Sequence, residues 1–465
     1  MIPIKEIPTK QWVKGALACL AYILFIVWVG NYWWLLLLPI IADIYLTKII
    51  PWTFWKKVKN PRLYSLFSWI DAILFALVAV YFINNFAFQN YQIPSSSLEK
   101  SLLVGDYLLV SKVHYGPRVP MTPLSMPLVQ HTFPWGGQSF STLIQWEYRR
   151  LAGLDTIKPL DIVVFNFPAG DTVASLVPNP DYYQLCNRYG KTTIQQHPEK
   201  FGEVVWRPVD RRENYVKRCV GLPGDTLQII DKHIYINGVA QQEPTGLQFN
   251  YLVATDGRAI SDKQFEQLGI SLDDRHLVNT WPDGNAILQY LDYSAINGQY
   301  PPVYYLPLTA NACQQIKGFP QVVSVIDDPS IFTGKVFPQA FDNWTCDNYG
   351  PIYIPRKGAT TPLTLANLPL YNRIISVYEG HDLTVKDSVI YIDGKQADSY
   401  TFAMNYYWMM GDNRHNSEDS RYWGYVPEDH IVGKPLFVWL SLDKDKSFFQ
   451  SIRWNRLFKS VDSLK

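Results

Sequence analysis

The sequence has little cysteine and lacks any grouping of metal-binding side chains. No CxxC pair and no Cys/His cluster occurs, which argues against a structural zinc site, so no metal is expected. Two interpretations of the cysteines stay open: isolated buried thiols, or a disulfide between Cys313 and Cys346 if their shared loop-rich region is exported. The five cysteines are Cys19, Cys186, Cys219, Cys313 and Cys346.

The chain also has very little net charge. Its 42 Lys and Arg residues against 41 Asp and Glu give a formal charge of +1, so the basic field expected of a nucleic-acid-binding protein is missing. Apolar residues are not scarce: they make up 48% of 465 residues, and aromatic residues make up 15%. The chain can therefore bury a core in two or more domains.

Charged residues are absent from Gly15 to Ala42, a run longer than the roughly 20 residues that one helix needs to cross a bilayer. A second apolar segment, residues 65–83, has Asp71 as its only charge. The first run is too long for a removable signal peptide and lacks a small-residue cleavage site, so it is interpreted as an anchor.

Basic residues near these runs predict the membrane topology. A break near Gly30 would turn the first run into a hairpin and give three spans, with the chain after residue 90 outside the cytoplasm. One tilted helix, and hence two spans, is the alternative. The basic residues are Lys5, Lys10 and Lys14 before the first run, and Lys48, Lys56, Lys57, Lys59 and Arg62 between the runs.

From residue 100 onward, short β-branched and aromatic runs alternate with Gly, Pro, Asn and Asp. This pattern predicts a mainly β fold, an antiparallel β-sandwich or barrel outside the cytoplasm, anchored by the N-terminal transmembrane helices. Helical periodicity is confined to residues 141–154. The expected strands lie in residues 102–113, 161–168, 214–225, 227–239, 387–395 and 436–442.

Two of these segments form an internal repeat, in which residues 215–238 align without a gap with residues 371–394. The pairs Asn237-Gly238 and Asp393-Gly394 predict type I′ hairpin turns, because both central residues need positive φ. The repeat brackets a predicted insertion at 241–369. The other expected parts are a membrane region at 1–64, a transmembrane helix at 65–90, a β-rich core at 91–240 and 370–445, and a basic amphipathic tail at 446–465, which would form a helix on the membrane surface or a packed terminal helix.

Ser97 is the candidate nucleophile, because it lies on a Pro-Ser-Ser-Ser turn between an apolar segment and a strand-like run. A serine hydroxyl needs a base to remove its proton. Lys217 can be that base if burial in its apolar strand lowers its pKa by about 2 to 3 units from about 10.4. In the repeat its counterpart is Arg373, which cannot usefully lose its proton.

Lys100 is a competing base, since Ser97 and Lys100 have the SxxK spacing that penicillin-binding proteins and class A β-lactamases place on a helix. Pro94 and the following strand-like run disfavour a helix here, and no Lys-Thr-Gly triplet occurs. A third polar stretch, residues 409–434, is either a turn-rich loop or a functional one in which Ser417 orients a buried amine.

Together, the three stretches around Ser97, Lys217 and Ser417 resemble bacterial type I signal peptidases, the membrane-bound Ser/Lys endopeptidases of the Sec and Tat export routes. The Pro-Ser-Ser-Ser-Leu stretch resembles the family's Pro-Ser-x-Ser-Met motif. The Lys-Arg pair that is followed by Gly-Leu-Pro-Gly-Asp resembles its lysine motif, and residues 411–421 resemble its Gly-Asp-Asn-Arg box. The resemblance covers residues 65–116, 157–168, 214–238 and 409–440.

The resemblance implies a role for each matching residue. Ser97 would be the nucleophile and Lys217 the general base, Ser95 and the Ser97 N–H would form the oxyanion hole, and Ser417 would orient the lysine. The supporting residues would be Asp412, Arg218, Asp419 and Arg421.

The resemblance further implies that signal-peptide-bearing preproteins are cut after small residues, such as in Ala-x-Ala, with no cofactor. It places the enzyme in the bacterial inner membrane as a multi-pass protein, in contact with the lipid bilayer and functionally linked to the export translocon, with the catalytic domain on the periplasmic side. Two other classes stay open: a membrane-anchored β-domain that binds exported chains without cutting them, and a penicillin-binding relative.

The match has departures beside Ser97. Leu98 replaces the usual Met, which conserves volume and should be tolerated. Glu99-Lys100-Ser101 replaces the usual Met-Pro-Thr and bears on how this loop meets substrate or membrane.

Overall fold

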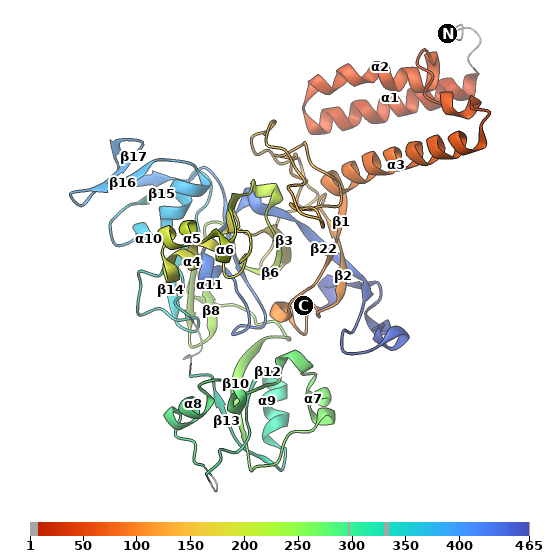
Figure 1. Ribbon diagram of the computed structural model, residues 1–465. Helices are drawn as coiled ribbons and strands as arrows, with labels where there is room; N and C mark the ends of the chain where they lie inside the picture. Colours follow the sequence, from red (N-terminus) through yellow and green to blue (C-terminus); the bar gives the residue numbers. More distant parts are fainter. Residues whose placement is uncertain (1–7, 296–297, 330–333, 465) are drawn as a thin grey trace. The chain divides into compact units, whose positions relative to one another are not determined.

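The computed structural model describes residues 8–295, 298–329 and 334–464 (Figure 1). The chain forms two compact units, one of residues 1–89 and 112–156 and the other of residues 90–111 and 157–465. Helices account for 33% and strands for 26% of the chain, so the fold is mixed rather than mainly β. The predicted antiparallel sheets and N-terminal helices are both present.

The first unit contains an N-terminal helical hairpin followed by a long helix. Helix α1 (Thr9–Val29) ends at Gly30, whose φ of 67° is left-handed, so the chain reverses where the sequence predicts a break. The returning arm (Tyr32–Thr47), which includes α2 (Leu38–Ala42), lies against α1, and a Cβ on Gly15 would be 3.0 Å from Leu46 (Figure 1). Helix α3 (Pro61–Phe86) follows.

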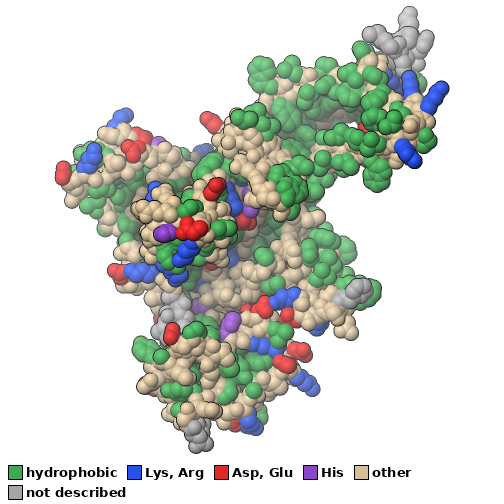
Figure 2. Space-filling model, viewed as in Figure 1, with side chains coloured by type: hydrophobic (Ala, Val, Ile, Leu, Met, Phe, Trp, Pro, Cys, Tyr) green, Lys and Arg blue, Asp and Glu red, His purple; other side chains and the backbone are tan. Residues whose placement is uncertain are grey.

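Helices α1 and α3 are each long and apolar enough to cross a membrane, whereas the returning arm is shorter. Whether that arm makes a third span stays a prediction, and Lys5 lies outside the described residues. Large apolar side chains are exposed on these helices, among them Trp33 at 79% and Phe75 at 76% (Figure 2). Such surfaces are unusual on a water-soluble domain.

The helix predicted at residues 141–154 is wrong, because this segment forms bends and extended chain. Its backbone pairs with residues 117–119 instead: Val119 N–H donates to the Arg149 carbonyl at 2.9 Å, and Leu151 N–H donates to the Pro117 carbonyl at 2.9 Å. These bonds between distant segments replace those of a helix.

The second unit is built on an eight-stranded sheet. Strand β6, which carries Lys217, lies between β3 and β20 and is antiparallel to both. It is therefore close to the polar loop that follows β20. In spatial order the strands are β1 (Phe88–Gln92), β2 (Asp106–Ser111), β22 (Ile431–Ser441), β3 (Ile162–Asn166), β6 (Asn214–Gly221), β20 (Tyr406–Met410) and β21 (Val426–Pro427), and β23 (Lys459–Ser460) pairs with β22.

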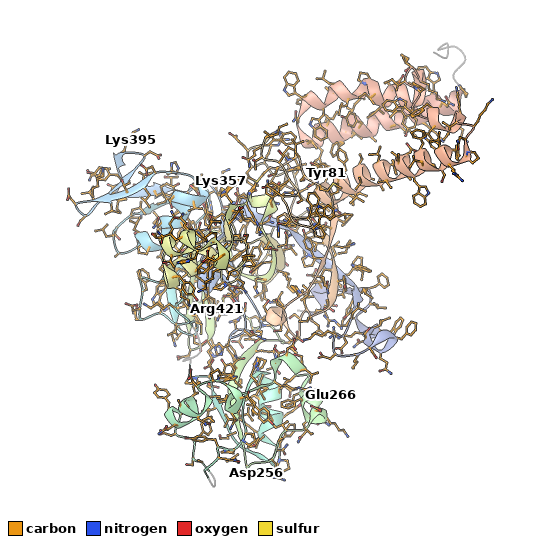
Figure 3. The ribbon with its side chains drawn as sticks, viewed as in Figure 1. Tyr81, Asp256, Glu266, Lys357, Lys395 and Arg421 are labelled. Carbon is orange, nitrogen blue, oxygen red and sulfur yellow. The ribbon has the colours of Figure 1, made fainter. Side chains whose placement is uncertain are left out.

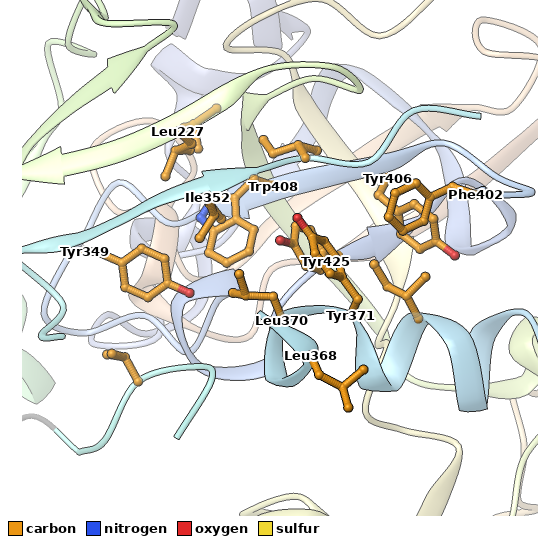
Figure 4. Packing of buried hydrophobic residues seen from close by; sticks show 14 of the residues in the cluster. Leu227, Tyr349, Ile352, Leu368, Leu370, Tyr371, Phe402, Tyr406, Trp408 and Tyr425 are labelled. Carbon is orange, nitrogen blue, oxygen red and sulfur yellow. The ribbon is translucent and has the colours of Figure 1, made fainter. Parts of the chain in front are cut away.

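An aromatic core supports one end of this sheet (Figure 4). Trp408 of β20 is fully buried, and its ring lies 5.3 Å from that of Tyr425 and 5.6 Å from that of Tyr349. Tyr349 belongs to β14 (Tyr349–Tyr353), which pairs with β7 (Thr226–Ile230). This packing fixes β20 and hence the start of the loop that follows it.

The internal repeat is confirmed only in its second half. Strands β7 and β8 (His233–Ile236) pair in the same register as β16 (Leu383–Lys386) and β17 (Val389–Ile392). Both predicted turns have positive φ, at Asn237 and Gly238 and at Asp393 and Gly394. The first halves differ, because Lys217 lies in β6 whereas Arg373 ends the helix α10 (Leu368–Arg373).

Within the predicted insertion, a four-stranded sheet has its own core, and Asp256 and Glu266, labelled in Figure 3, belong to this part. Cys313 packs in this core, whereas Cys346 packs in the aromatic core, so of the two interpretations the separate buried thiols hold and no disulfide joins them. The predicted domain boundaries stay a prediction. The elements are β10 (Gln248–Thr255), α7 (Asp262–Leu268), β11 (His276–Leu277), α8 (Gly284–Tyr290), β12 (Val303–Thr309), α9 (Ala310–Lys317) and β13 (Val322–Asp327).

Three short helices that the sequence does not predict follow β3 and β4 (Thr172–Ala174): α4 (Tyr182–Tyr189), α5 (Lys191–Gln196) and α6 (Pro198–Phe201). They bury their own small cluster, which includes Leu185 and Ile194.

The C-terminal segment does not form the predicted amphipathic or packed helix. Described residues 446–464 make 3₁₀ turns and the short strand β23. The reason is that Arg456 turns inward, donating from Nε and Nη2 to the buried carboxylate of Asp106 at 3.1 and 2.5 Å and from Nη2 to the Ser101 carbonyl at 3.0 Å. These contacts fasten the tail to the segment after Ser97.

Candidate active site

Ser97 lies on a 3₁₀ turn, Ser96–Leu98, that directly follows β1. Leu98 anchors the turn, since it is 1% exposed and packs with Ile93. The Ser97 carbonyl accepts a hydrogen bond from Asn413 N–H at 3.1 Å. The backbone of the candidate nucleophile is therefore held both by its own core and by the loop after β20.

Lys217 lies in β6, with its side chain buried in the sheet. Burial lowers the pKa of its amine to about 8, while the nearby carboxylates of Asp419, Glu418 and Asp412 raise it and the Arg421 guanidinium lowers it. A fall of this size from 10.5 agrees with the requirement derived from the sequence, because a neutral amine is the form that can accept a proton.

Ser97 and Lys217 line one cavity of about 410 Å³, together with Ser95. Ser95 precedes the turn in an extended conformation and is exposed. Throughout the residues that the structure describes, neither Ser97 Oγ nor Lys217 Nζ has a hydrogen-bond partner, so both polar groups are available to a ligand in the cavity. Catalytic contacts are often formed only once substrate is bound.

The loop after β20 carries Ser417, Asp419 and Arg421. Ser417 Oγ donates to Asp419 Oδ2 at 2.8 Å, and Gly411 N–H donates to the same oxygen at 3.0 Å. Arg421, labelled in Figure 3, binds the Asp419 carboxylate through Nε at 2.9 Å and Nη2 at 2.8 Å. This bidentate pair is buried, and it braces the loop.

Gly411 allows the loop to approach the serine turn. A Cβ at this position would lie 2.3 Å from Ser417 Oγ and 2.6 Å from the Ser97 carbonyl oxygen. Ser417 is thereby placed beside the backbone of Ser97, and only glycine fits between them. The predicted contact of Ser417 with the Lys217 amine stays a prediction.

Arg218 and Asp412 form a second buried ion pair, each 1% exposed at its side chain. Arg218 donates to Asp412 from Nε at 2.8 Å and from Nη2 at 2.7 Å, and Ser101 Oγ donates to Asp412 Oδ2 at 2.7 Å. Neighbouring residues of a strand point to opposite faces, so Lys217 can face the cavity while Arg218 ties β6 to the loop.

Glu99 and Lys100, the two charged departures, face the insertion. The Lys100 amine donates a short hydrogen bond to the Gly269 carbonyl at the end of α7. Burial raises the pKa of Glu99 to about 7, with Asp274 of the insertion also raising it and Lys100 and Arg453 lowering it. With its amine bound at Gly269, Lys100 is a poor candidate for the base of Ser97.

The insertion also holds the catalytic loop through its backbone. Gln248 of β10 donates its N–H to the Asp412 carbonyl and accepts from Arg414 N–H, both at 2.9 Å. Two asparagines of the loop bind the residue before Ser97: Asn413 Nδ2 donates to the Ser96 carbonyl at 3.4 Å and Asn416 Nδ2 to Ser96 Oγ at 3.0 Å. Sequence reasoning assigned no role to these residues, although their place in the polar box was a signal.

The sequence did not predict a role for His415 either. Among the residues that the structure describes, His415, Cys346 and Asp347 form the one group of possible metal ligands that lie close together. Its Nδ1 lies 3.2 Å from the N–H of Asn250 and 3.4 Å from Asp328 Oδ2, and its Nε2 lies 2.9 Å from Asp347 Oδ1. Both ring nitrogens are thus satisfied within the protein, and the arrangement suits a structural link better than a metal ligand.

A serine and a buried lysine on one cavity fit a serine hydrolase whose general base is an amine. The family model for signal peptidase, peptidase S26, matches residues 66–277 and 395–440. The chain belongs to this family. It is a membrane-anchored serine peptidase, and α1 and α3 are its candidate membrane helices.

Three relatives illustrate the similarity. Signal peptidase I of Buchnera aphidicola subsp. Acyrthosiphon pisum is 24% identical over 407 residues, covering 86% of this chain and 82% of the relative. Signal peptidase I of Rickettsia felis is 24% identical over 343 residues, covering 66% of this chain and 88% of the relative. Signal peptidase I of Aquifex aeolicus is 56% identical over 36 residues, covering 8% and 14%. The family predicted from the motifs is confirmed.

Proposed function

We propose that the protein removes N-terminal signal peptides from exported preproteins, with Ser97 as the nucleophile and Lys217 as the general base. Membership of the signal peptidase family supports the reaction. The observation that carries the residue assignment is the shared cavity, into which Ser97 and a lysine with a pKa of about 8 both open.

In the acylation step, Ser97 Oγ bonds to the carbonyl carbon of the scissile peptide while its proton passes to the neutral amine of Lys217. The Ser97 N–H and the Ser95 hydroxyl stabilise the oxyanion, and each such donor is typically worth about 2.7 to 4 kcal/mol. The ammonium of Lys217 then protonates the leaving nitrogen as the C–N bond breaks.

In the deacylation step, Lys217 takes a proton from water, whose oxygen attacks the acyl carbon. The ester C–O bond breaks, and the proton returns to Ser97 Oγ. Ser417 is proposed to orient the lysine: its hydroxyl proton is directed at Asp419, so the remaining lone pairs of its oxygen can accept from the amine.

We place the enzyme in the bacterial inner membrane as a multi-pass protein, with its catalytic unit on the periplasmic side. The basic cluster from Lys48 to Arg62, which follows the hairpin and reaches the first turn of α3, supports a cytoplasmic loop there. In this orientation the enzyme contacts the lipid bilayer and meets preproteins that leave the export translocon. Protease added to spheroplasts should digest the catalytic unit, and protection of that unit would contradict the topology.

The direct test is cleavage of a purified preprotein by the full chain in detergent or vesicles. Ser97→Ala and Lys217→Ala should each abolish cleavage while the melting temperature stays near that of the wild type. Lys100→Ala is the matched control and should retain cleavage, because the Lys100 amine binds Gly269. Activity retained in Ser97→Ala, or lost only in Lys100→Ala, would contradict the assignment.

The same preparation separates the alternatives. A domain that binds exported chains without cutting them would leave the preprotein intact in the wild type. A penicillin-binding relative would be labelled covalently at Ser97 by a fluorescent penicillin, a reaction that the position of Lys100 does not favour.

A further inference from the structure

A second cavity adjoins the catalytic one. It has a volume of about 680 Å³ and a polar lining that includes Gln184, Asn187 and Ser417. Asn179, Asn416 and Glu418 line both cavities. Because carboxamide side chains can donate to and accept from a peptide backbone, this groove suits a polypeptide segment that continues from the catalytic cavity.

Glu418 is the acidic side chain shared by the two cavities, and helix α4 fixes its position. Gln184 Nε2 donates to Glu418 Oε1 at 3.0 Å and to Asp181 Oδ2 at 2.7 Å. Asp181 in turn accepts from the N–H of Tyr183 at 2.8 Å and so caps α4. The carboxylate is thus held at the junction by a helix that the motifs of the family did not predict.

Two cations, Arg188 and Lys335, also line the second cavity, and Lys335 is paired with Asp342. The carboxylates next to Glu418 itself favour a positive ligand. Burial and the nearby carboxylates of Asp181 and Asp419 raise the pKa of Glu418, whereas Lys217 lowers it. The negative charge is therefore costly until a cation joins it, and a substrate lysine or arginine would replace the hydration that burial removes. An acidic substrate side chain would instead meet Glu418 and Asp181 as like charges.

We propose that Glu418 makes the junction of the two cavities a subsite for a lysine or arginine side chain of the substrate, close to the cleaved bond. The inference rests on the proposed function, since the substrate is taken to be a polypeptide cut at Ser97. It adds to that function a preference for charge that the serine and lysine alone do not supply.

The test uses the full chain and peptide substrates with one signal-peptidase cleavage site, in which each residue near the cleaved bond is replaced in turn by Lys, Gln or Glu. At one position the wild type should prefer Lys over Glu in kcat/KM by on the order of tenfold or more. Glu418→Gln should flatten this ratio, and Glu418→Lys should reverse it. The readout is the ratio within each variant.

Glu199→Gln is the matched control, because Glu199 is an exposed residue of the neighbouring α6 and lines neither cavity. This variant should keep the wild-type ratio. If the wild type prefers no charge at any position, or if Glu418→Gln shifts the pH profile but keeps the ratio, the subsite is overturned. If the wild type cleaves none of the peptides nor a preprotein, the proposed function itself fails.

Discussion

The hydroxyl of Ser417 donates a 2.8 Å hydrogen bond to Oδ2 of Asp419, and the same carboxylate receives two bonds from the guanidinium of Arg421. The serine is therefore oriented by a buried charge pair rather than by solvent. Since a hydroxyl that donates to a carboxylate keeps its lone pairs for a second partner, the direction of this bond determines what Ser417 can offer to the cavity.

Ser417→Ala should lower kcat and leave KM nearly unchanged. Loss of one well-aligned hydrogen bond to a charged group corresponds to about 1.5 to 3 kcal/mol, or roughly 10- to 150-fold in rate. Ser417→Thr keeps the hydroxyl and should restore most of the activity. Steady-state kinetics on a preprotein provides the measurement, and an unchanged kcat in the alanine variant would show that Lys217 is oriented by another group.

The pH dependence of cleavage should report on Lys217. Burial holds its pKa near 8, so the amine is mostly protonated below that pH and mostly neutral above it. The value of kcat/KM should fall tenfold per pH unit well below pH 8 and level off above it, provided that substrate ionisation is controlled. A profile that still rises toward pH 10 would mean that the base has an ordinary lysine pKa.

Gly411→Ala should abolish activity. The added Cβ would lie within 2.6 Å of both Ser417 and the Ser97 carbonyl, so the loop and the serine turn must separate. Gly318→Ala is the control, because a Cβ there would meet only the Gln315 carbonyl oxygen, at 3.3 Å and outside the site. Cleavage assays with melting curves for both variants test this prediction, and near-normal cleavage by Gly411→Ala would contradict the described packing.

Glu99→Gln should stabilise the protein at high pH. The carboxyl has a pKa of about 7 in the folded protein, against an ordinary value of 4.5, so ionisation favours the unfolded state as pH rises between these values. Above pH 7 the charged form costs on the order of 3 kcal/mol, and below about pH 4.5 this cost disappears.

The melting temperature of Glu99→Gln should therefore exceed that of the wild type at pH 8 and match it at pH 4. Glu203→Gln removes an exposed carboxyl and serves as the control. An equal gain at both pH values would mean that the glutamine acts through packing rather than through charge.

The two candidate catalytic residues could be predicted because short sequence motifs determine their local structure. Burial of Leu98 and the turn-forming serines specify the bend that carries Ser97, and the apolar neighbours of Lys217 specify a buried strand. Glu418 could not be found in the same way. Its position depends on Gln184, which lies 234 residues earlier in the sequence.

The errors have a similar cause. Helices α4 to α6 are short and are stabilised by a cluster that includes Leu185 and Ile194, so local periodicity gave little signal. In the C-terminal segment, apolar and basic residues alternate as they would in an amphipathic helix. The buried carboxylate of Asp106 binds Arg456 instead, and a tertiary ion pair overrides the local preference.

The pairing of Gln248 with the catalytic loop makes the amide of Arg414 a reporter on the insertion. Its hydrogen can exchange with solvent only when the bond to the Gln248 carbonyl opens, and that opening separates β10 from the loop. The exchange rate of this single amide therefore measures how often the insertion releases the loop, on a timescale of minutes to hours and without any substrate present.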